Sequence, residues 1–427
     1  MNKKLYKEAL DFHSQHPKGK IAITLPKKLT NKHDLSLAYS PGVAAVCQEI
    51  HADINKMYDY TSKGNFVAVV SNGTAILGLG NLGAAASKPV MEGKAALFKR
   101  FADINSIDIE IDETDPEKFV DIVKKISVGW GGINLEDIKA PECFTIEEKL
   151  KEHLDIPVFH DDQHGTAIVT AAALINAIHI TNRKIEKARV VVNGAGAAAI
   201  ASIRLMILLG VKQENIIVCD TKGVIYKGRH YGMNKWKENI SSDTKLRSLD
   251  QSMCGADIFI GVSAKGTVSK EMIKSMANQP IIFAMANPDP EITPEEVYAV
   301  RDDAIIATGR SDYKNQVNNF ICFPYLFRGA LDVRATTIND EMKIAAVYSL
   351  SSLARTKKNN QPNDSSSIDE ECIFGHDYII PTTFDQRLMV EVSIAVAKAA
   401  INSGVARVKI TDFNIYRKEL LARINTK

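Results

Sequence analysis

The segment from Ala188 to Gly210, ARVVVNGAGAAAIASIRLMILLG, decides the fold class of this chain. It combines a short apolar run, a glycine-containing turn and an apolar helix, and the run IIVCD follows at 216–220. Strand, turn, helix and strand in this order are typical of one βαβ unit in a parallel sheet. Further apolar runs at 257–262, 280–288 and 304–309 predict additional parallel strands.

The turn of this unit contains a dinucleotide-binding signature. Gly194, Gly196, Ala197 and Ala199 belong to GAGAAA, which matches the pattern G-x-G-x-x-G/A. The glycines permit a tight turn and close approach of a pyrophosphate, and the small third residue lets the helix pack near the strand. Asp220 ends the next strand, 21 residues after Ala199, a spacing that suits a carboxylate bonded to the adenosine ribose. We expect these five residues to bind a dinucleotide.

The choice between NAD and NADP rests on Asp220 and its surroundings. Its carboxylate would repel a 2′-phosphate, which favours NAD. Lys222 lies two residues further on and is a candidate partner for that phosphate, so NADP stays open. A glycine-rich turn in some other α/β protein is the remaining alternative.

Length and composition exclude several classes of function. The 427 residues suggest two or three domains, and 45% hydrophobic with 24% charged residues is ordinary for a globular protein. A net charge of +2 offers no electrostatic footprint for nucleic acid or an acidic membrane. No apolar run approaches the roughly 20 residues of a membrane span, the N-terminus lacks a secretion-type apolar segment, and the six cysteines are scattered. We therefore expect a cytoplasmic enzyme with neither nucleic-acid nor membrane partners.

Two pairs of adjacent acidic residues lie where predicted strands end. Glu136 and Asp137 follow GGINL, and Asp161 and Asp162 lie between IPVFH and the predicted helix at 164–178. Adjacent residues do not share a helix or strand face, so both members of a pair can serve one site only in a turn or at an element's end. Mg²⁺ and similar cations prefer such oxygen ligands, so we expect a metal site. Helix capping by the second pair and a solvated turn at the first are the alternatives.

A lysine lies on the apolar face of a helix predicted at 87–101. The apolar stripe of this helix consists of Val90, Leu97, Phe98 and Phe101. Lys94 falls on the same stripe, and burial would lower its pKa and make it a candidate proton acceptor. A lysine whose stem packs while its ammonium reaches water is the commoner outcome, and spacing alone favours it.

Four further polar residues follow turns or strand ends. Tyr39 precedes Ser-Pro-Gly, so it should sit on a turn, where a phenol can transfer a proton. Asn287, Asn318 and Asn319 lie at or beyond predicted strand ends, where open α/β sheets bind ligands. We expect these amides to orient a substrate carboxylate or the nicotinamide. A packed tyrosine and asparagines in Asx-turns are the alternatives.

These segments together resemble a malic enzyme of the short bacterial type, over nearly the whole chain. The shared blocks are LSLAYSPGVA (35–44), LGLGNLG (77–83), KPVMEGKAALFK (88–99), GGINLEDIKAPECF (131–144), IPVFHDDQHGTAI (156–168), VVNGAGAAA (191–199), ANPDPEI (286–292), ATGRSDYKNQVNNFICFPYLFRGALDVRA (307–335) and YIIPTTFDQRL (378–388). Several blocks are long and distinctive, so the match is specific. The resemblance implies oxidative decarboxylation of L-malate to pyruvate and CO₂, with Mg²⁺ or Mn²⁺ as metal and with reduction of NAD or NADP.

The resemblance also implies a role for each matching residue. Tyr39 is the acid that protonates the enol intermediate, and Lys94, assisted by Asp161, is the base that takes the hydroxyl proton. The implied metal ligands are Glu136, Asp137 and Asp162. The implied malate-holding residues are Asn287 and Asn319, with Asn318 beside them. The resemblance thus reverses the interpretation of Lys94 that spacing alone favours.

The chain departs from the family pattern around the LGLG block. Large animal-type members carry a substrate-binding arginine before it, and this chain has NGTAI at 72–76, so the substrate carboxylate needs another partner. Asn81 replaces a common acidic residue, and GAAA at 83–86 replaces a common Gly-Pro start. None of these changes removes a proposed catalytic group. We expect no long phosphotransacetylase-like extension in 427 residues.

The expected architecture is α/β with two domains and a helical tail. We predict an N-terminal substrate domain at 1–162, a Rossmann-type doubly wound NAD(P)-binding domain at 163–385 and C-terminal helices at 386–427 that pack back on the body. The polar stretch at 357–367 reads as a surface loop or linker. The site should lie in the cleft between the domains, whose closure would exclude water. The resemblance suggests a homodimer or a larger even assembly.

Two other functions stay open. A malolactic-type enzyme would use a similar pocket, metal and retained NAD but convert malate to lactate without net redox change. A catalytically silent nucleotide sensor or scaffold on the same fold is the second alternative, since a fold does not determine a function. The presence of Tyr39, Lys94 and all the acidic positions argues against the silent protein.

Overall fold

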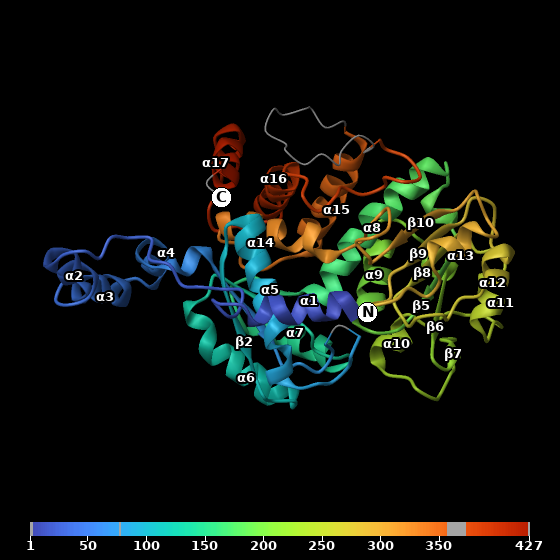
Figure 1. The fold of residues 1–427 in the computed structure, drawn as a ribbon, viewed down its shortest axis with the longest axis horizontal. Helices are drawn as coiled ribbons and strands as arrows, with labels where there is room; N and C mark the ends of the chain where they lie inside the picture. Colours follow the sequence, from blue (N-terminus) through green and yellow to red (C-terminus); the bar gives the residue numbers. More distant parts are fainter. Residues whose placement is uncertain (1–2, 77, 357–372, 426–427) are drawn as a thin grey trace.

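Two β-sheets, formed by consecutive stretches of the chain, organise the computed structural model, which describes residues 3–76, 78–356 and 373–425 (Figure 1). The stretch at 357–367 that we predicted as a linker lies outside the described residues. Among these residues, no helix is long and apolar enough to span a bilayer.

The first sheet has four parallel strands in the order β2-β1-β3-β4. Its strands are β1 (Phe66–Ser71), β2 (Asn105–Glu110), β3 (Gly132–Leu135) and β4 (Val158–His160). Its connecting helices are α5 (Ala84–Ala102), α6 (Pro116–Ile126) and α7 (Glu142–His153). Strand β3 is buried throughout and β1 almost so, as expected for parallel strands covered on both faces. Helix α5 begins at Ala84, one turn earlier than we predicted, after Gly83 at φ 85°.

The second sheet has six strands in the order β10-β9-β8-β5-β6-β7. These are β5 (Val190–Asn193), β6 (Ile216–Asp220), β7 (Gly223–Val224), β8 (Ile258–Gly261), β9 (Ile281–Ala284) and β10 (Ile305–Thr308). Only β7 runs antiparallel. The connections leave β5 in opposite directions toward β6 and β8, which is the switch point where doubly wound sheets bind nucleotides. The predicted α/β fold with a Rossmann-like half is therefore confirmed.

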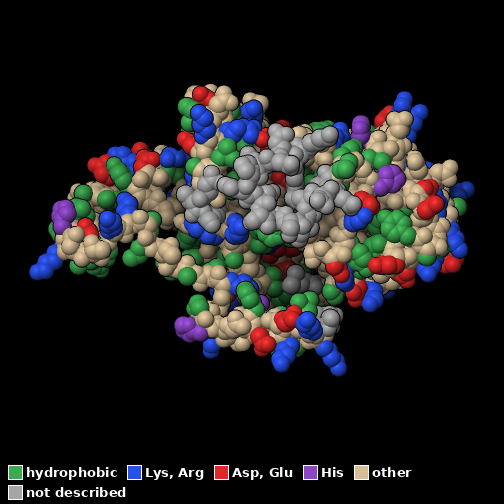
Figure 2. Space-filling view, turned by 45° about the horizontal axis from the view of Figure 1, so that its top comes forward, with side chains coloured by type: hydrophobic (Ala, Val, Ile, Leu, Met, Phe, Trp, Pro, Cys, Tyr) green, Lys and Arg blue, Asp and Glu red, His purple; other side chains and the backbone are tan. Residues whose placement is uncertain are grey.

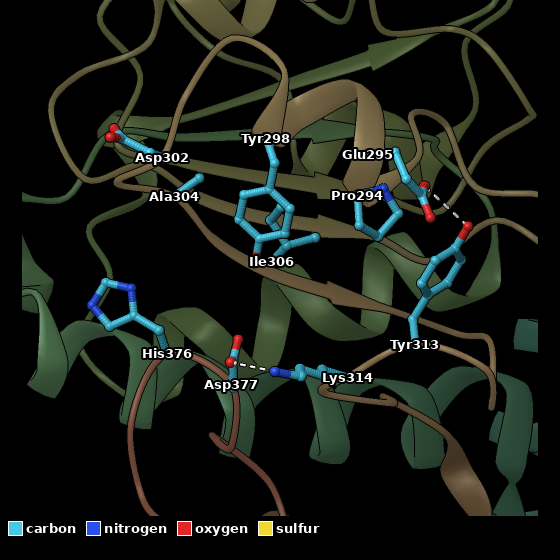
Figure 3. A pocket seen from close by; sticks show the side chains of 10 residues that line it. All are labelled: Pro294, Glu295, Tyr298, Asp302, Ala304, Ile306, Tyr313, Lys314, His376 and Asp377. Atoms are coloured by element: carbon cyan, nitrogen blue, oxygen red, sulfur yellow. Dashed lines mark hydrogen bonds and ion pairs between the residues drawn. The ribbon is translucent and has the colours of Figure 1, made fainter.

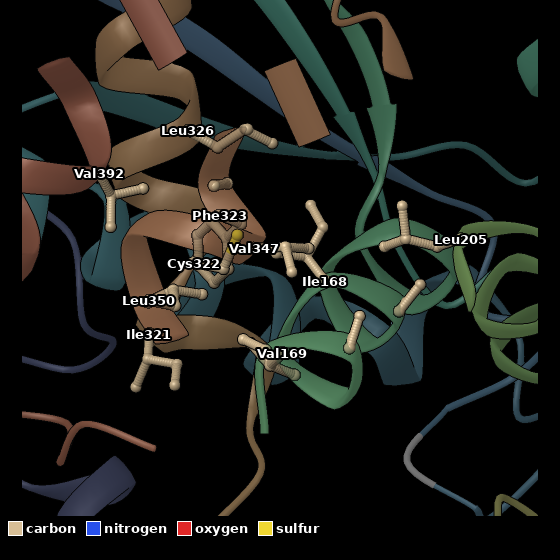
Figure 4. Close-up of a cluster of buried hydrophobic side chains, with 14 of the residues drawn as sticks. Ile168, Val169, Leu205, Ile321, Cys322, Phe323, Leu326, Val347, Leu350 and Val392 are labelled. Atoms are coloured by element: carbon tan, nitrogen blue, oxygen red, sulfur yellow. The ribbon is translucent and has the colours of Figure 1, made fainter. Parts of the chain in front are cut away.

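Ten further α-helices follow the first sheet along the described chain, and some of them join the two sheets. They are α8 (Asp161–Ile180), α9 (Ala197–Leu208), α10 (Lys235–Asn239), α11 (Leu249–Met253), α12 (Lys270–Ser275), α13 (Pro294–Tyr298), α14 (Phe323–Asp332), α15 (Asp340–Arg355), α16 (Arg387–Asn402) and α17 (Phe413–Asn425). Side chains of α8, α9, α14, α15 and α16 interdigitate in the core shown in Figure 4. The same cluster reaches Val67 of β1 and Phe98 of α5 on one side and Val190 of β5 on the other. This shared core fixes the two sheets relative to each other.

The first sixty residues contribute almost nothing to this core. Helices α1 (Lys3–Ser14), α2 (Lys32–Ala38) and α3 (Val43–Ala52) contain no buried residue, and α4 (Met57–Tyr60) leads into β1. Helices α2 and α3 form a projection that stands clear of the body in both overall views (Figures 1 and 2). The exposed apolar residues of this N-terminal arm include Leu5, Leu10, Phe12, Ile23, Leu25, Leu35, Leu37 and Tyr39. An apolar surface of this kind is typical of an interface.

Candidate active site

Lys94 lies at the meeting point of three elements. Helix α5 carries it inward, where its side chain is only 8% exposed. Its Nζ lies 2.6 Å from Asp161 Oδ2, at the start of α8, and 2.8 Å from Glu136 Oε1, just beyond β3. The Phe323 ring of α14 covers the ammonium at 4.3 Å from the ring centre. Lys94 therefore does not reach out to water, and the packed but solvated lysine favoured by spacing alone is wrong.

Glu136, Asp137 and Asp162 form the acidic cluster beside this lysine. Ligand oxygens of the three carboxylates lie within 4.8 Å of one another. The chain places them by ending β3 in a turn, where Asp137 takes φ 53°, and by starting α8 directly after β4. The backbone N–H of Asp137 donates to Asp162 Oδ2 at 2.8 Å, which ties the two acidic pairs together. A strained left-handed residue of this kind is typical of functional turns.

The electrostatics of this cluster fit a cation. Burial and the neighbouring Asp162 raise the pKa of Glu136 to about 7, against the pull of Lys94. Burial likewise raises the pKa values of Asp161 and Asp162 to about 6. Burial acts to lower the pKa of Lys94, but Asp161 and Glu136 outweigh it and raise that pKa. Crowded carboxylates with raised pKa values are stabilised by a divalent ion, so the three residues present fit a hard metal such as Mg²⁺ or Mn²⁺.

The structure brings Asn319, from the chain beyond β10, close to the start of α8 beside Asp161. Asn319 begins a short 3₁₀ helix (Asn319–Ile321), and its Cβ lies against Gly165 in the first turns of α8. A Cβ on Gly165 would approach Asp161 Oδ1 to 1.9 Å, so only glycine leaves room there. Asn318 caps the same 3₁₀ helix by accepting from the Phe320 N–H.

Asn287 approaches from the loop after β9. Its backbone oxygen lies so close to Gly78 that a Cβ there would come within 2.6 Å. Its amide faces Gly309 after β10, where a Cβ would lie 3.3 Å from Asn287 Oδ1. Asn287 as a residue is exposed to solvent.

The glycine turn lies at the switch point of the second sheet. Gly194 takes φ 124°, and a Cβ on it would come within 2.5 Å of the Val262 carbonyl oxygen beyond β8. No atom lies within 4 Å of a Cβ built on Gly196, which leaves the start of α9 open for a phosphate. Ala197 begins α9, and Ala199 is fully buried, as close helix packing requires.

Asp220 is engaged rather than free. Arg229 donates to both of its oxygens, at 2.9 and 2.5 Å, and Lys237 Nζ lies 2.7 Å from Oδ2. The Lys222 N–H also donates to Oδ1 at 2.9 Å. Burial opposes ionisation of this carboxyl, yet the bonds from Arg229 and Lys237 lower its pKa to about 2. Our expectation of NAD assumed an unpaired Asp220, and the structure gives that carboxylate four donors.

Tyr39 lies apart from all these residues. It follows α2 on the projecting part of the arm, and its side chain is 73% exposed. Helix α5, which carries Lys94, belongs to the body (Figure 1). Within one chain, therefore, the phenol does not meet the lysine.

Sequence reasoning missed several polar residues around the candidate site. Arg229 lies in an irregular segment and Lys237 in the short helix α10, both too short for a recognisable period, although their charge near Asp220 was a usable signal. Glu147 of α7 is buried among polar partners, and the polar residue on the helix's inner face was its signal. Glu291 is fully buried and accepts from the Ser263 and Ala286 N–H groups, joining the loops after β8 and β9.

A cavity of about 490 Å³ lies elsewhere, between α13, the outer edge of β10 and the segment at 376–377 (Figure 3). Its acidic side chains are partly engaged: Asp377 pairs with Lys314, and Glu295 accepts from the Tyr313 hydroxyl. None of our predicted site residues lines it.

The two sheets and the open glycine turn at the switch point define a two-part α/β protein with a Rossmann-like dinucleotide-binding half. Family models agree with this class. "Malic enzyme, N-terminal domain" matches residues 18–151, and "Malic enzyme, NAD binding domain" matches residues 163–366. The chain belongs to the malic enzyme family.

Individual relatives support the same assignment. A probable NADP-dependent malic enzyme of Rickettsia prowazekii is 63% identical over 425 residues, which cover 100% of this chain and 55% of that protein. An NADP-dependent malic enzyme of Halomonas elongata is 55% identical, over 93% of this chain and 94% of its own length. The crystal structure of the malic enzyme from Pyrococcus horikoshii superposes with a TM-score of 0.89 at 41% identity, covering 99% of this chain and 96% of that one. The chain spans about half the length of several curated relatives, the Rickettsia protein among them.

Proposed function

We propose that this chain catalyses the metal-dependent oxidative decarboxylation of L-malate to pyruvate and CO₂. The observation that carries the proposal is the buried Lys94, held between Asp161 and the acidic cluster by bonds of 2.6 and 2.8 Å. One carboxylate partner of this lysine belongs to the candidate metal-binding cluster. The protonation state of the lysine therefore depends on the charge of that cluster. Oxidation at a hydroxyl next to a metal needs such a base.

Each polar group has a separate task in this reaction. Lys94 takes the proton from the C2 hydroxyl, and Asp161 orients its amine and accepts from it. Glu136, Asp137 and Asp162 would hold Mg²⁺ or Mn²⁺, which when bound supplies a Lewis acid for the oxygens of the substrate. A dinucleotide on the Gly194 turn would receive the hydride.

The amides and the charge of Lys94 complete the pocket. Asn287 and Asn319 would donate to the carboxylates of malate, with Asn318 shaping the loop beside them. Burial favours the neutral amine of Lys94, whereas two facing carboxylates favour the ammonium. The proton of Lys94 is therefore released more readily when Glu136 faces a cation instead.

The position of Tyr39 leads us to propose a homodimer with shared sites. The phenol lies on an arm whose apolar side chains are exposed among the described residues, and it follows α2, which stands away from α5 and its Lys94 (Figure 1). A second copy of the chain would bury this surface and receive Tyr39 beside its own Lys94. There the phenol would protonate C3 of the enol, which completes the reaction.

For the cofactor we propose NADP as the preferred dinucleotide. Arg229 and Lys237 neutralise Asp220, and Lys222 adds an exposed cation beside them. Three cations against one carboxylate leave the end of β6 positive, which suits a 2′-phosphate rather than a bare ribose. The names of the Rickettsia and Halomonas relatives agree with this choice.

The test is an assay of nicotinamide reduction with L-malate and Mn²⁺, run in parallel with NAD and NADP, after which pyruvate and lactate are quantified. We expect reduced NADP in step with pyruvate, and no reaction after chelation. Lactate without net reduced cofactor would establish a malolactic enzyme instead. Dinucleotide binding without turnover would establish a silent sensor.

A further inference from the structure

A buried carboxylate on α7 is hydrogen-bonded to the residues that flank the second acidic pair. Glu147 is only 5% exposed, and its carboxylate accepts from His164 Nε2 at 2.9 Å through both oxygens. It also accepts from the His160 backbone N–H at 3.3 Å, and Lys151 Nζ lies 2.6 Å from Oε1. One carboxylate therefore has three different donors.

The two histidines among these donors bracket the pair Asp161-Asp162. His160 ends β4 directly before the pair, and His164 lies one residue beyond Gln163 in the first turn of α8. Both flanks of the second acidic pair are thus bonded to Glu147. A carboxylate at the N-terminus of a helix is also favoured by the helix dipole, which strengthens this attachment.

The helix that carries Glu147 is joined to the first acidic pair. Helix α7 begins at Glu142, five residues after Asp137, so the turn holding Glu136 and Asp137 leads straight into it. The first acidic pair is connected to α7 by the chain itself, and the second acidic pair is connected to it by the hydrogen bonds of Glu147. This connection adds to the Asp137 N–H bond to Asp162 and to Lys94, whose Nζ contacts both Glu136 and Asp161.

We propose that Glu147 is a positioning residue of the proposed metal site, which holds Asp162 at binding distance from Glu136 and Asp137. The three ligand carboxylates repel one another without a cation, so a scaffold must hold them together before one binds. Glu147 supplies it by fixing the first turn of α8 against α7. The inference rests on the proposed metal site but assigns a residue outside it, since Glu147 is not one of the three clustered acids.

The charge of Glu147 is balanced by its partners, which determines the choice of variant. Burial acts to raise the pKa of Glu147, but His164 and Lys151 outweigh it and keep the carboxyl ionised. Lys343 of α15 also lies nearby and is itself buried. An alanine would leave the partly buried Lys151 and His164 without their carboxylate partner and would test folding. Glu147→Gln keeps the shape and one acceptor oxygen, and so tests the attachment.

The experiment measures Mn²⁺ binding by electron paramagnetic resonance in the full chain, with neither malate nor dinucleotide present. Glu147→Gln is compared with wild type and with Glu148→Gln, a control at the neighbouring, 58% exposed carboxylate. We expect the Kd for Mn²⁺ to rise about 10-fold or more in Glu147→Gln, as for other groups that orient metal ligands, and to stay unchanged in the control. At saturating Mn²⁺ the kcat should recover while the KM for Mn²⁺ stays raised.

Each outcome decides one question. A folded Glu147→Gln protein with the wild-type Kd for Mn²⁺ would overturn the positioning role and leave Glu147 as a packing residue. If that variant does not fold, His164→Leu removes the same attachment from the other side, and an unchanged Kd there overturns the role equally. Failure of wild type to bind Mn²⁺ would overturn the metal site itself, and the positioning role with it.

Discussion

Lys94 and Asp161, 67 positions apart in the chain, meet in the interior with Nζ 2.6 Å from Oδ2. This contact depends on two elements. Helix α5, beside the first sheet, carries the lysine, and helix α8, which lies between the two sheets, carries the aspartate. Because Glu136 faces the same ammonium at 2.8 Å, the lysine is also bonded to the acidic cluster. The candidate base and the candidate metal site therefore share one carboxylate, that of Glu136.

Replacement of this lysine should strongly reduce turnover. We expect Lys94→Ala to lower kcat with malate by about 10² to 10⁴, the usual contribution of a positioned acid or base. Lys99→Ala, five residues further along the same helix and 55% exposed, is the matched control and should keep full activity. Steady-state kinetics of both variants provides the measurement. Wild-type turnover in Lys94→Ala would remove the proposed mechanism, although dinucleotide binding would remain.

The sequence could predict those features of the site that depend on residues close together in the chain. Position 194 requires a positive φ and close backbone contact. Only glycine meets both requirements, so the turn can be recognised in the sequence. The acidic pairs at strand ends and Lys94 on an apolar stripe follow from the periods of strand and helix.

The remainder depends on contacts between elements that no period encodes. Asp220 has the correct spacing for a ribose, but Arg229 reaches it from an irregular segment beyond β7 and Lys237 from the helix α10. Glu147 meets His164 only when α7 and the start of α8 come together in the fold. The turn at Tyr39 was visible in the sequence, whereas its distance from Lys94 depends on how the arm leaves the body.

Removal of one carboxylate from the acidic cluster should weaken metal binding. Asp162→Asn keeps the shape of the side chain and loses its charge, so we expect the affinity for Mn²⁺ to fall by about 10-fold or more. Asp121→Asn on α6, 58% exposed, serves as control. Calorimetric titration of Mn²⁺ into each protein gives the result. Equal affinities for Mn²⁺ in the two variants would show that the metal binds at a different site.

The shared-site homodimer can be tested by mixing two inactive chains. Tyr39→Phe and Lys94→Ala are refolded together, so that a hybrid dimer combines the intact lysine of one chain with the intact tyrosine of the other. Random pairing should restore about a quarter of wild-type activity, since half of the dimers are hybrids and each has one complete site. If Tyr39 instead acts within its own chain, the mixture stays as inactive as its components.

The cations at the end of β6 should determine the choice of dinucleotide. We expect Lys222→Ala and Lys237→Ala each to lower kcat/KM for NADP by about 10-fold, the worth of a charge-assisted bond to phosphate, while NAD changes little. Lys227→Ala, an exposed lysine between them in sequence, is the control. A wild-type preference for NAD, unaltered in both variants, would instead restore the role of ribose acceptor to Asp220.

The first sheet contains a pH-sensitive pair that is remote from the acidic cluster. Asp108 and Glu110 share one face of β2, and Lys88 Nζ lies 2.7 Å from Asp108 Oδ2 and 3.6 Å from Glu110 Oε2. Burial, and then the hydrogen bond and repulsion with Asp108, raise the pKa of Glu110 from 4.5 to about 7. The folded protein therefore holds a proton that the unfolded chain releases near pH 4.5. Glu110 thus contributes stability below that pH, and the contribution is lost as the pH rises through 7.

The variant Glu110→Gln should remove this dependence, since its amide donates to Asp108 at every pH. We expect similar urea midpoints for wild type and variant at pH 5, and a variant more stable by about 1 kcal/mol at pH 8, discounted because Glu110 is partly exposed to solvent. Glu117→Gln, 66% exposed on α6, controls for the loss of one surface charge. Parallel loss of stability in wild type and Glu110→Gln between these pH values would show that another group binds the proton. Since Lys88 and Lys94 share α5, activity measured on the same samples would also reveal whether the pair affects the position of the catalytic lysine.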